Sequence, residues 1–314
     1  MIKAYLIHLS MNMWEDWQVD YFTSDYLRHR IFSPDFRTEE PVWDRTVKAL
    51  ADGGNNMIVI DLGDAVQYKS HPEIAVNGAW STAKLREKLQ QCRDLGLEVI
   101  PKMNFSCCHS AWLKEYRPLV GTPKYHQVCS DLITEAIELF DGPRFFHIGM
   151  DEETFDHQTF FRLAIVRQGR MWWEDLAFYL DEISRQNVRP WMWADVIWRQ
   201  GEELFTQYIS KNVVQSNWYY DKNFNPDNHF DPNHIYLTGY TMLSKLGYDQ
   251  IPASSNWQCR ESYGATVEYA LKNIPKEHLL GFLNTCWYQT CEAQEHHIKE
   301  AIALMNEAHR KNGI

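Results

Sequence analysis

Short apolar runs alternate with segments of helical periodicity along most of this chain. Runs such as Met57-Ile58-Val59-Ile60 are almost continuously apolar, which is typical of strands that are covered on both faces. Between the runs, apolar residues recur every three or four positions, as at Leu85, Leu89 and Cys92, which predicts helices with one buried face. The pattern therefore predicts a regular succession of strand and helix.

Eight strands are predicted, beginning near residues 2, 56, 97, 144, 190, 212, 250 and 279. Helices are predicted at about 41–50, 81–96, 124–140, 171–183, 201–209 and 241–247, and on both sides of the last strand. Strict alternation predicts a parallel sheet, and eight units favour closure into a (β/α)8 barrel, one domain over residues 1–314. The alternative is an open doubly wound sheet, which would need a glycine-rich phosphate turn that the sequence lacks.

Two segments are predicted to be long loops. Residues 11–40 are aromatic and charged without a clean period, and residues 221–234 are rich in Asn, Asp and Pro. Long loops in compact domains are often functional. The sequence leaves open whether the 11–40 loop closes the barrel mouth or contacts a second chain in a homo-oligomer.

Charge and composition narrow the possible partners. A net charge of -11 and a pI near 5.6 argue against nucleic-acid binding, which needs a basic face. No apolar run approaches the roughly 20 residues of a membrane span, and residues 2–9 are too short for a signal-peptide core. The seven Cys lack C-x-x-C spacing. We therefore expect a cytoplasmic protein with reduced thiols, no membrane contact and no cofactor or structural metal.

Polar and aromatic residues follow every predicted strand from the second onward, at the end where a parallel barrel places its functional residues. They are Asp61 and Asp64, Asn104 and His109, Asp151 and Glu152, Trp193 and Asp195, Trp218 with Tyr219 and Tyr220, Asn256 and Trp257, and Trp287. Taken singly, each has an ordinary explanation as a core ring, a loop residue or a helix cap. Together, rings beside carboxylates suit a carbohydrate, which packs its C–H face on aromatics and bonds its hydroxyls to polar groups.

The adjacent carboxylates of Asp151 and Glu152 are the strongest chemical signal. They come directly after the apolar strand at Phe145-Phe146, although acidic residues are poor strand formers and costly to bury. One explanation is the capping of the next helix by a carboxylate. The other is a functional role at the barrel mouth, since packing does not account for acidic residues directly after a buried strand.

Two motifs make the chain similar to glycoside hydrolase family 20, the N-acetyl-β-hexosaminidases. The family hallmark H-x-G-G-D-E matches His147-Ile148-Gly149-Met150-Asp151-Glu152, and I-P-E-x-D-x-P-G-H resembles Ile100-Pro101-Lys102-Met103-Asn104-Phe105 running on to His109. Weaker matches are Trp193-Ala194-Asp195, Trp218 and Trp287. The resemblance covers most of residues 41–310.

This resemblance implies a retaining, exo-acting glycosidase in which the substrate's own 2-acetamido oxygen attacks the anomeric carbon and forms an oxazolinium intermediate. It implies Glu152 as general acid and base, and Asp151 as the group that orients the acetamido N–H. Tryptophans 193, 218 and 287 would wall the sugar. The implied partner is an N-acetylated hexosamine glycoside.

The chain departs from the family pattern around this pair. Met150 replaces a glycine, and Lys102 and Asn104 replace two acids. The family's first-strand Arg has no counterpart, its seventh-strand Tyr is not evident, and Gln289 stands where a glutamate is frequent. The departures favour an altered specificity, and they leave open a barrel that binds sugar without turnover.

Two further hypotheses stay open at this point. A two-carboxylate glycosidase would use Glu152 as acid and Asp195 or Glu292 as its partner. A metal-dependent hydrolase would use His109, His147, Asp151 and Cys108, although no H-x-H or H-E-x-x-H spacing supports it.

Overall fold

Eight parallel strands form the centre of the computed structural model, which describes residues 1–15, 30–228, 231 and 233–314. The sheet order is β8-β7-β6-β5-β2-β1-β10-β9. The strands are β1 (Ile2–His8), β2 (Met57–Asp61), β5 (Glu98–Lys102), β6 (Phe145–His147), β7 (Arg189–Trp193), β8 (Val214–Ser216), β9 (Ala253–Ser255) and β10 (Gly281–Thr285). A short pair, β3 (Val66–Gln67) and β4 (Trp80–Ser81), lies outside this sheet.

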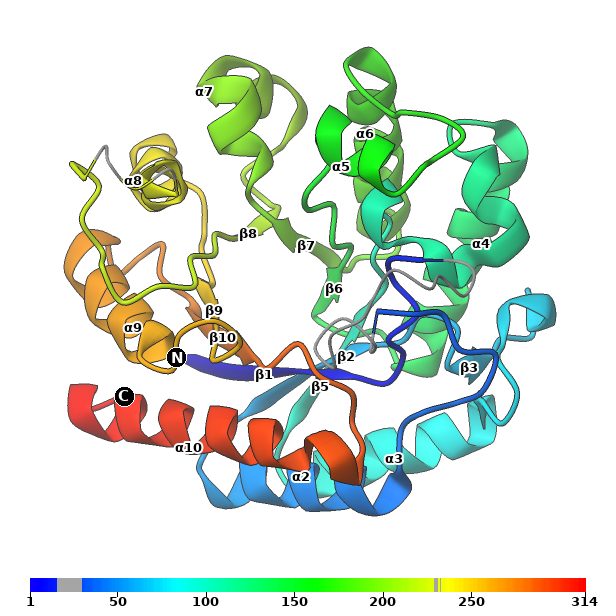
Figure 1. Ribbon diagram of the computed structural model, residues 1–314, viewed down its shortest axis with the longest axis horizontal. Coiled ribbons are helices and arrows are strands. Elements are labelled where there is room, and N and C mark those ends of the chain that lie inside the picture. The colour runs from blue at the N-terminus through cyan, green and yellow to red at the C-terminus, as the bar shows by residue number, and fades with distance from the viewer. Residues whose placement is uncertain (16–29, 229–230, 232) are drawn as a thin grey trace.

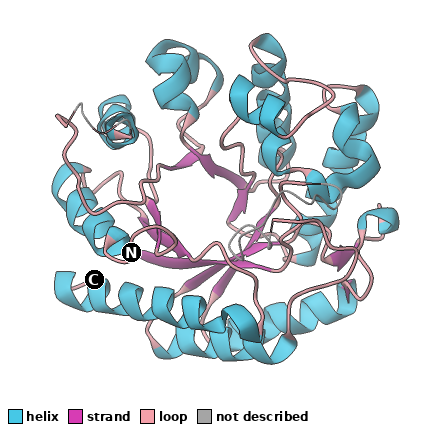
Figure 2. Ribbon diagram, in the orientation of Figure 1, coloured by secondary structure: helices cyan, strands magenta, loops and turns pink. Residues whose placement is uncertain are grey.

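The two ends of the sheet, β8 and β9, meet and close it. Parallel bridges join Gln215 to Gln250 and Trp218 to Ala253, and Ile251 donates its backbone N–H to the Gln215 carbonyl at 2.9 Å. The ring of strands surrounded by helices is visible in Figures 1 and 2. The predicted (β/α)8 barrel is therefore confirmed, and all eight predicted strands are present.

Helices follow the strands and cover the outside of the barrel. They are α2 (Glu40–Asp52), α3 (Thr82–Asp94), α4 (Pro123–Leu139), α5 (Phe155–Phe160), α6 (Arg170–Ser184), α7 (Val196–Tyr208), α8 (His234–Leu246), α9 (Ser262–Asn273) and α10 (Glu295–Asn312). Local signals fix several starts: the Ser81 hydroxyl accepts from the Lys84 N–H at 3.1 Å, and the Thr122 hydroxyl accepts from the Tyr125 N–H at 3.2 Å, which is N-capping.

Three helices differ from the prediction. Helix α7 begins at Val196 and continues past the non-helical backbone of Gly201, whereas the prediction started at residue 201. Helix α8 begins at His234, directly after the polar loop. Helix α5 was not predicted, because six residues are too few to show a helical period. In the part of the chain that the structure describes, no helix has the length and apolar character that a bilayer crossing needs.

Apolar residues fill the barrel as well as the layer beneath the helices. Along β1, Ile2, Ala4 and Leu6 pack inside the barrel, whereas Tyr5 and Ile7 pack against the helices, as the two-residue period of a strand requires. The barrel interior is thus a packed core, and ligand chemistry is confined to its mouth.

Candidate active site

The tip of β6 turns sharply and aims its carboxylates at the barrel mouth. Gly149, Met150 and Glu152 have φ of 71°, 72° and 58°, in the left-handed region that costs a side-chain-bearing residue energy. A Cβ on Gly149 would lie 2.0 Å from Oδ1 of Asn104, so glycine is required there. Asn104 fills this space, accepts from the Met150 N–H at 3.2 Å and donates to Asp151 Oδ1 at 2.9 Å.

His109 lies between the two carboxylates of the tip. Its Nδ1 is 3.3 Å from Oδ1 of Asp151, and its Nε2 is 3.3 Å from Oε2 of Glu152. The His109 side chain is 5% exposed and that of Asp151 is 12% exposed, whereas that of Glu152 is 33% exposed. The cluster therefore opens to solvent mainly at Glu152. Trp14 packs edge-on against the His109 ring at 5.9 Å.

Charge interactions set where the proton of this cluster lies. Burial alone would lower the pKa of His109, but the charges and hydrogen bonds of Asp151 and Glu152 outweigh burial and raise the pKa of His109 to about 10. Burial alone would raise the pKa of both carboxyls, but the contact with His109 holds the pKa of Asp151 and of Glu152 below the ordinary values. At neutral pH the proton is therefore on His109, and both carboxylates are ionised.

The donor geometry of this cluster does not fit the hypothesised metal-dependent hydrolase. His109, Asp151 and Glu152 bring one ligand atom each within 4.8 Å, but the imidazole uses its two opposite nitrogens toward the two carboxylates. A single ion would need one lone pair and both carboxylates on the same side. The other two proposed ligands are engaged elsewhere: His147 Nδ1 accepts from the Gly149 N–H at 3.1 Å, and Cys108 Sγ donates to the Glu152 carbonyl at 3.3 Å.

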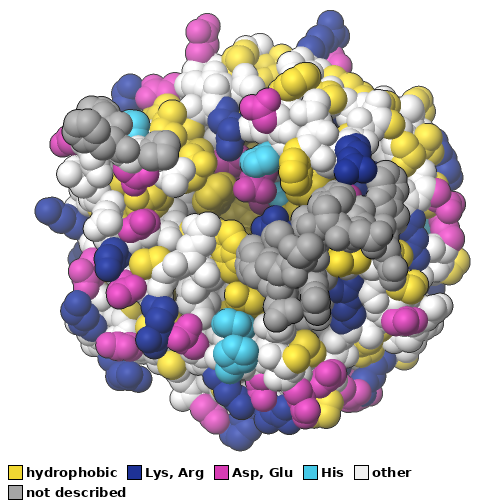
Figure 3. All heavy atoms as spheres, viewed as in Figure 1, with side chains coloured by type: hydrophobic (Ala, Val, Ile, Leu, Met, Phe, Trp, Pro, Cys, Tyr) yellow, Lys and Arg dark blue, Asp and Glu magenta, His cyan; other side chains and the backbone are white. Residues whose placement is uncertain are grey.

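A cavity of about 250 Å³, here called the pocket, opens above these carboxylates. Figure 3 shows a hollow at the centre of this face in which hydrophobic and acidic side chains gather. Eight of the predicted site residues line the pocket: Asn104, His109, Asp151, Glu152, Trp218, Tyr220, Trp257 and Trp287. The structure thus brings the tips of barrel strands β5, β6, β8, β9 and β10 to one place.

An aromatic wall stands beside the carboxylates. Trp218 stacks on Tyr220 with ring centroids 5.4 Å apart, and Trp287 donates its Nε1–H to the Tyr220 hydroxyl at 3.1 Å. Because the Tyr220 oxygen is the acceptor in this bond, its own O–H can donate to a ligand. Tyr236 packs against Trp218 at 5.2 Å. The wall offers apolar faces together with one directed hydroxyl.

The other six predicted site residues do not line the pocket. Asp61 lies in the barrel interior, 2.6 Å from Lys102 Nζ, and Trp193 packs there against His147 at 4.5 Å. Asp64 accepts from the Ser10 hydroxyl at 2.6 Å and from Asn12 at 2.8 Å. All three side chains point toward partners from other parts of the chain. A residue's position at a strand tip does not show in which direction its side chain points.

The remaining three also point away from the pocket. The Tyr219 hydroxyl donates to Asp231 at 2.9 Å, and the Asn256 amide donates to Glu300 at 2.9 Å. Asp195 lies behind the tip of β6, where its Oδ2 accepts from the Glu152 backbone N–H at 3.0 Å. Burial and the nearby charge of Asp151 raise the pKa of Asp195 to about 7.

Loops and the first turn of α8 supply the pocket residues that the sequence did not single out, namely Met13, Trp14, Arg30, Asn233, Tyr236 and Gln258. Three of them belong to the 11–40 segment, whose residues 16–29 lie outside the described part of the chain. Arg30 lies over the Trp14 ring at 4.8 Å. The aromatic and charged composition of that segment was the one available signal, and the described residues of the loop do reach the mouth.

With the geometry established, comparison with solved structures places the fold in a class. The chain has the (β/α)8 fold of solved family 20 glycoside hydrolases, the β-N-acetylhexosaminidases. Identities of 12–17% among the similar structures establish this likeness for the fold alone. No family sequence model matches the chain, and no curated protein matches it either.

Three particular structures show the extent of the similarity. An exo-β-N-acetylglucosaminidase from Vibrio harveyi, solved with N-acetylglucosamine, superposes with a TM-score of 0.64 at 13% identity, over 98% of this chain and 54% of its own. A β-N-acetylhexosaminidase from Bacteroides fragilis gives 0.63 at 14%, over 98% and 65%. Dispersin B gives 0.55 at 14%, over 98% and 99%. The chain thus spans about half the length of the first of these proteins and nearly all of the last.

Proposed function

We propose that this protein is an exo-acting, retaining β-N-acetylhexosaminidase. The observation that carries the proposal is the pair Asp151 and Glu152, bridged by His109, at the floor of a pocket walled by Trp218, Tyr220 and Trp287. The pocket suits one pyranose with its acetamido group and is closed below by the packed barrel. The fold shared with family 20 structures supports the same activity.

The reaction would use the acetamido group of the substrate as nucleophile. Asp151 would accept the acetamido N–H, and Tyr220 would donate its O–H to the acetamido oxygen. The oxygen attacks the anomeric carbon while the glycosidic C–O bond breaks, and Glu152 gives its proton to the leaving oxygen. Glu152 then takes a proton from water, which opens the oxazolinium ring at the anomeric carbon and restores the configuration.

His109 would be the proton store for Glu152. In the free protein the proton lies on His109, 3.3 Å from the Glu152 carboxylate. A bound sugar displaces water from the exposed side of Glu152, and desolvation raises the proton affinity of a carboxylate. The proton can then move from His109 to Glu152 across their existing contact. Glu152 is therefore protonated, and able to act as an acid, only when substrate is bound.

The structure gives no support to an enzymic nucleophile at the two positions considered. The Asp195 carboxylate is 2% exposed and is turned toward the Glu152 backbone. The Glu292 side chain is 73% exposed and lies 3.9 Å from Arg45. Neither Glu292 nor Arg45 lines the pocket. Substrate-assisted attack therefore accounts better for the residues that do face the pocket.

Hydrolysis of 4-nitrophenyl β-N-acetylglucosaminide and β-N-acetylgalactosaminide tests this function, with the β-glucoside as control. We expect turnover of the two N-acetylated substrates alone, and a loss of about 10²–10⁴-fold in kcat/KM for Glu152→Gln. Equal rates for the wild type and Glu152→Gln would remove Glu152 from the acid role. Binding of the N-acetylated sugars by calorimetry without any turnover would contradict the enzyme and indicate a carbohydrate-binding barrel.

A further inference from the structure

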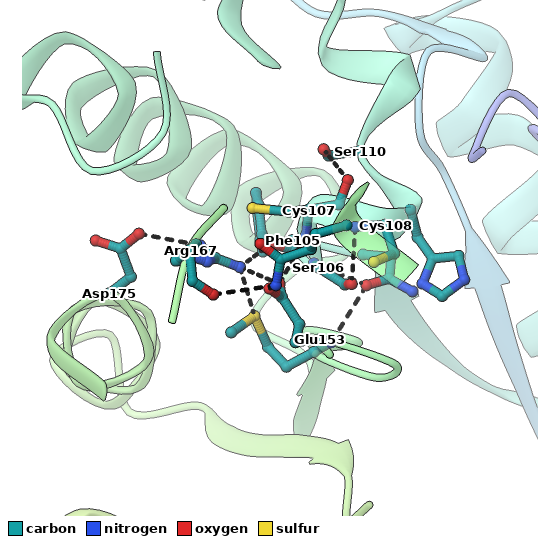
Figure 4. Close-up of polar contacts among 12 residues, drawn as sticks. Phe105, Ser106, Cys107, Cys108, Ser110, Glu153, Arg167 and Asp175 are labelled. Atoms are coloured by element: carbon teal, nitrogen blue, oxygen red, sulfur yellow. Dashed lines mark hydrogen bonds and ion pairs between the residues drawn. The ribbon is translucent and has the colours of Figure 1, made fainter. Parts of the chain in front are cut away.

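Glu153, the third carboxylate after β6, belongs to a different environment from its two neighbours. It follows Glu152 directly, yet its side chain is 4% exposed and lies outside the pocket. Its partner is Arg167, whose side chain is 0% exposed. Figure 4 shows Arg167 between Glu153 and Asp175. Two buried charges of this kind are costly unless geometry and hydrogen bonding compensate them.

Arg167 connects several parts of the fold. Besides the ion pair with Glu153, its guanidinium donates to Asp175 Oδ2 at 3.0 Å, to the Tyr179 hydroxyl at 3.1 Å and to the Phe105 carbonyl at 2.8 Å. Asp175 and Tyr179 lie on α6, and Phe105 follows β5. One planar donor set therefore fixes the loop after β5 and the tip of β6 against the same helix.

Glu153 makes the second link to the loop after β5. Its carboxylate accepts the backbone N–H of Cys107 at 2.6 Å. Cys107 is the first residue of the 3₁₀ turn η2 (Cys107–His109), and His109 is the last. Figure 4 shows Glu153 beside Cys107. The carboxylate that adjoins Glu152 in the chain therefore holds the turn that presents His109 to Glu152.

We propose that Glu153 and Arg167 are positioning residues, which clamp η2 against the tip of β6 so that the His109 ring stays between Asp151 and Glu152. Neither side chain touches the pocket, and both act through backbone groups at positions 105 and 107. The catalytic consequence rests on the proposed function, whereas the geometric claim does not.

A pair of double variants isolates the clamp from its charge. Glu153→Met with Arg167→Met removes both charges and the acceptor for the Cys107 N–H. Glu153→Gln with Arg167→Met also removes both charges but keeps an acceptor at that position. Since both variants are neutral there, a difference between them reports the hydrogen bond to η2.

The readout is the titration of the His109 imidazole nitrogens by NMR, which needs no substrate. Among the described residues, the titratable groups that act on His109 are Asp151 and Glu152 on the tip of β6, with Glu153 behind them. We expect the His109 midpoint in the Met/Met variant to fall at least about one pH unit below that in the Gln/Met variant, and kcat/KM to fall about tenfold further.

Equal His109 midpoints in the two double variants, with lowered melting temperatures in both, would show a merely structural role and overturn the proposal. If the Met/Met variant does not fold, Arg167→Lys serves, since a single ammonium cannot reach Asp175 as well as Glu153 and the Phe105 carbonyl, to which the guanidinium donates through two different nitrogens. A lowered midpoint would support the clamp, and an unchanged one would contradict it. A shifted midpoint in a protein that hydrolyses no glycoside would refute the proposed function and leave the clamp standing.

Discussion

Two clusters of carboxylate and base occupy neighbouring strand ends of this barrel, and they differ in what surrounds them. At the mouth, His109 bridges Asp151 and Glu152, and the Glu152 side chain is 33% exposed in the pocket. In the interior, Asp61 lies 2.6 Å from Lys102 Nζ and 3.4 Å from His8 Nδ1, and all three side chains are at most 4% exposed.

The base in each cluster decides what the carboxylate can do. A lysine ammonium against Asp61 is a fixed charge, and it helps to hold the pKa of Asp61 below its usual value against the effect of burial. The imidazole of His109 carries its proton at neutral pH, because Asp151 and Glu152 raise the pKa of His109 to about 10, and it can pass that proton to Glu152 when a ligand desolvates the carboxylate. The interior cluster therefore neutralises charge within the core, whereas the mouth cluster can exchange a proton with a ligand.

The largest expected effect concerns the stability of the interior cluster. Lys102→Met leaves Asp61 buried without its cation, so we expect a loss of about 3–5 kcal/mol in the free energy of unfolding. The activity of the folded fraction should change little, because Lys102 does not line the pocket. Urea unfolding and active-site-normalised kinetics measure the two quantities. A stable but inactive Lys102→Met protein would break the distinction between the clusters.

At the mouth we expect the opposite, a large loss of activity with little loss of stability. Asp151→Asn should lower kcat about 10²–10³-fold, since it removes a preorganised charge from beside the reacting group, while the protein remains folded. Asp64→Asn is the matched control, because it also changes a buried tip carboxylate, but one outside the pocket. Steady-state kinetics on the N-acetylglucosaminide should separate the two variants, and a comparable loss in Asp64→Asn would argue against the assignment.

Asp195 lies behind the mouth cluster and gives a pH-dependent prediction. Its pKa is about 7 in the fold and close to 3.9 when unfolded, so the unfolded chain releases this proton first. Stability from this group is therefore lost as the pH rises from about 4 to 7. We therefore compare the free energy of unfolding of Asp195→Asn with that of the wild type. This difference should be more favourable to the variant at pH 8 than at pH 4, by on the order of 2–4 kcal/mol. Unfolding curves of both proteins at the two pH values check this, and a pH-independent difference would contradict it.

The smallest effect is expected in the aromatic wall. Tyr220→Phe removes the O–H proposed for the acetamido oxygen and the acceptor for Trp287, so kcat/KM should fall about tenfold. Tyr219→Phe is the control, since the Tyr219 hydroxyl bonds Asp231 outside the pocket. Equal kinetics for the two variants would show that the acetamido oxygen is held elsewhere.

The sequence predicted the barrel, and it placed Asp151 and Glu152 at the barrel mouth, because both predictions rest on local patterns. Apolar runs marked all eight strands, and the acidic residues Asp151 and Glu152 directly after the run at Phe145-Phe146 marked the tip of the fourth. It did not predict which way the tip side chains turn. Asp64 and Asn256 bond to Ser10 and Glu300, which are distant in the sequence, so tertiary contacts decided their direction.

Loop residues were beyond prediction for the same reason. Trp14 and Arg30 reach the pocket because their loop folds over the mouth, and Tyr236 reaches it because α8 begins beside the mouth. No periodicity encodes either placement. The barrel fixes the positions of residues at strand ends, whereas tertiary packing fixes the positions of residues on loops.

Hydrolysis of a series of 4-nitrophenyl β-glucosaminides with N-acetyl, N-fluoroacetyl, N-difluoroacetyl and N-trifluoroacetyl groups tests the central claim most directly. Fluorine makes the acyl oxygen a poorer nucleophile while the sugar and leaving group stay the same. If Asp151 and Glu152 support attack by that oxygen, kcat/KM falls steeply with each added fluorine. Rates that do not depend on the acyl group would mean that the substrate's oxygen takes no part in the reaction, and would contradict the account.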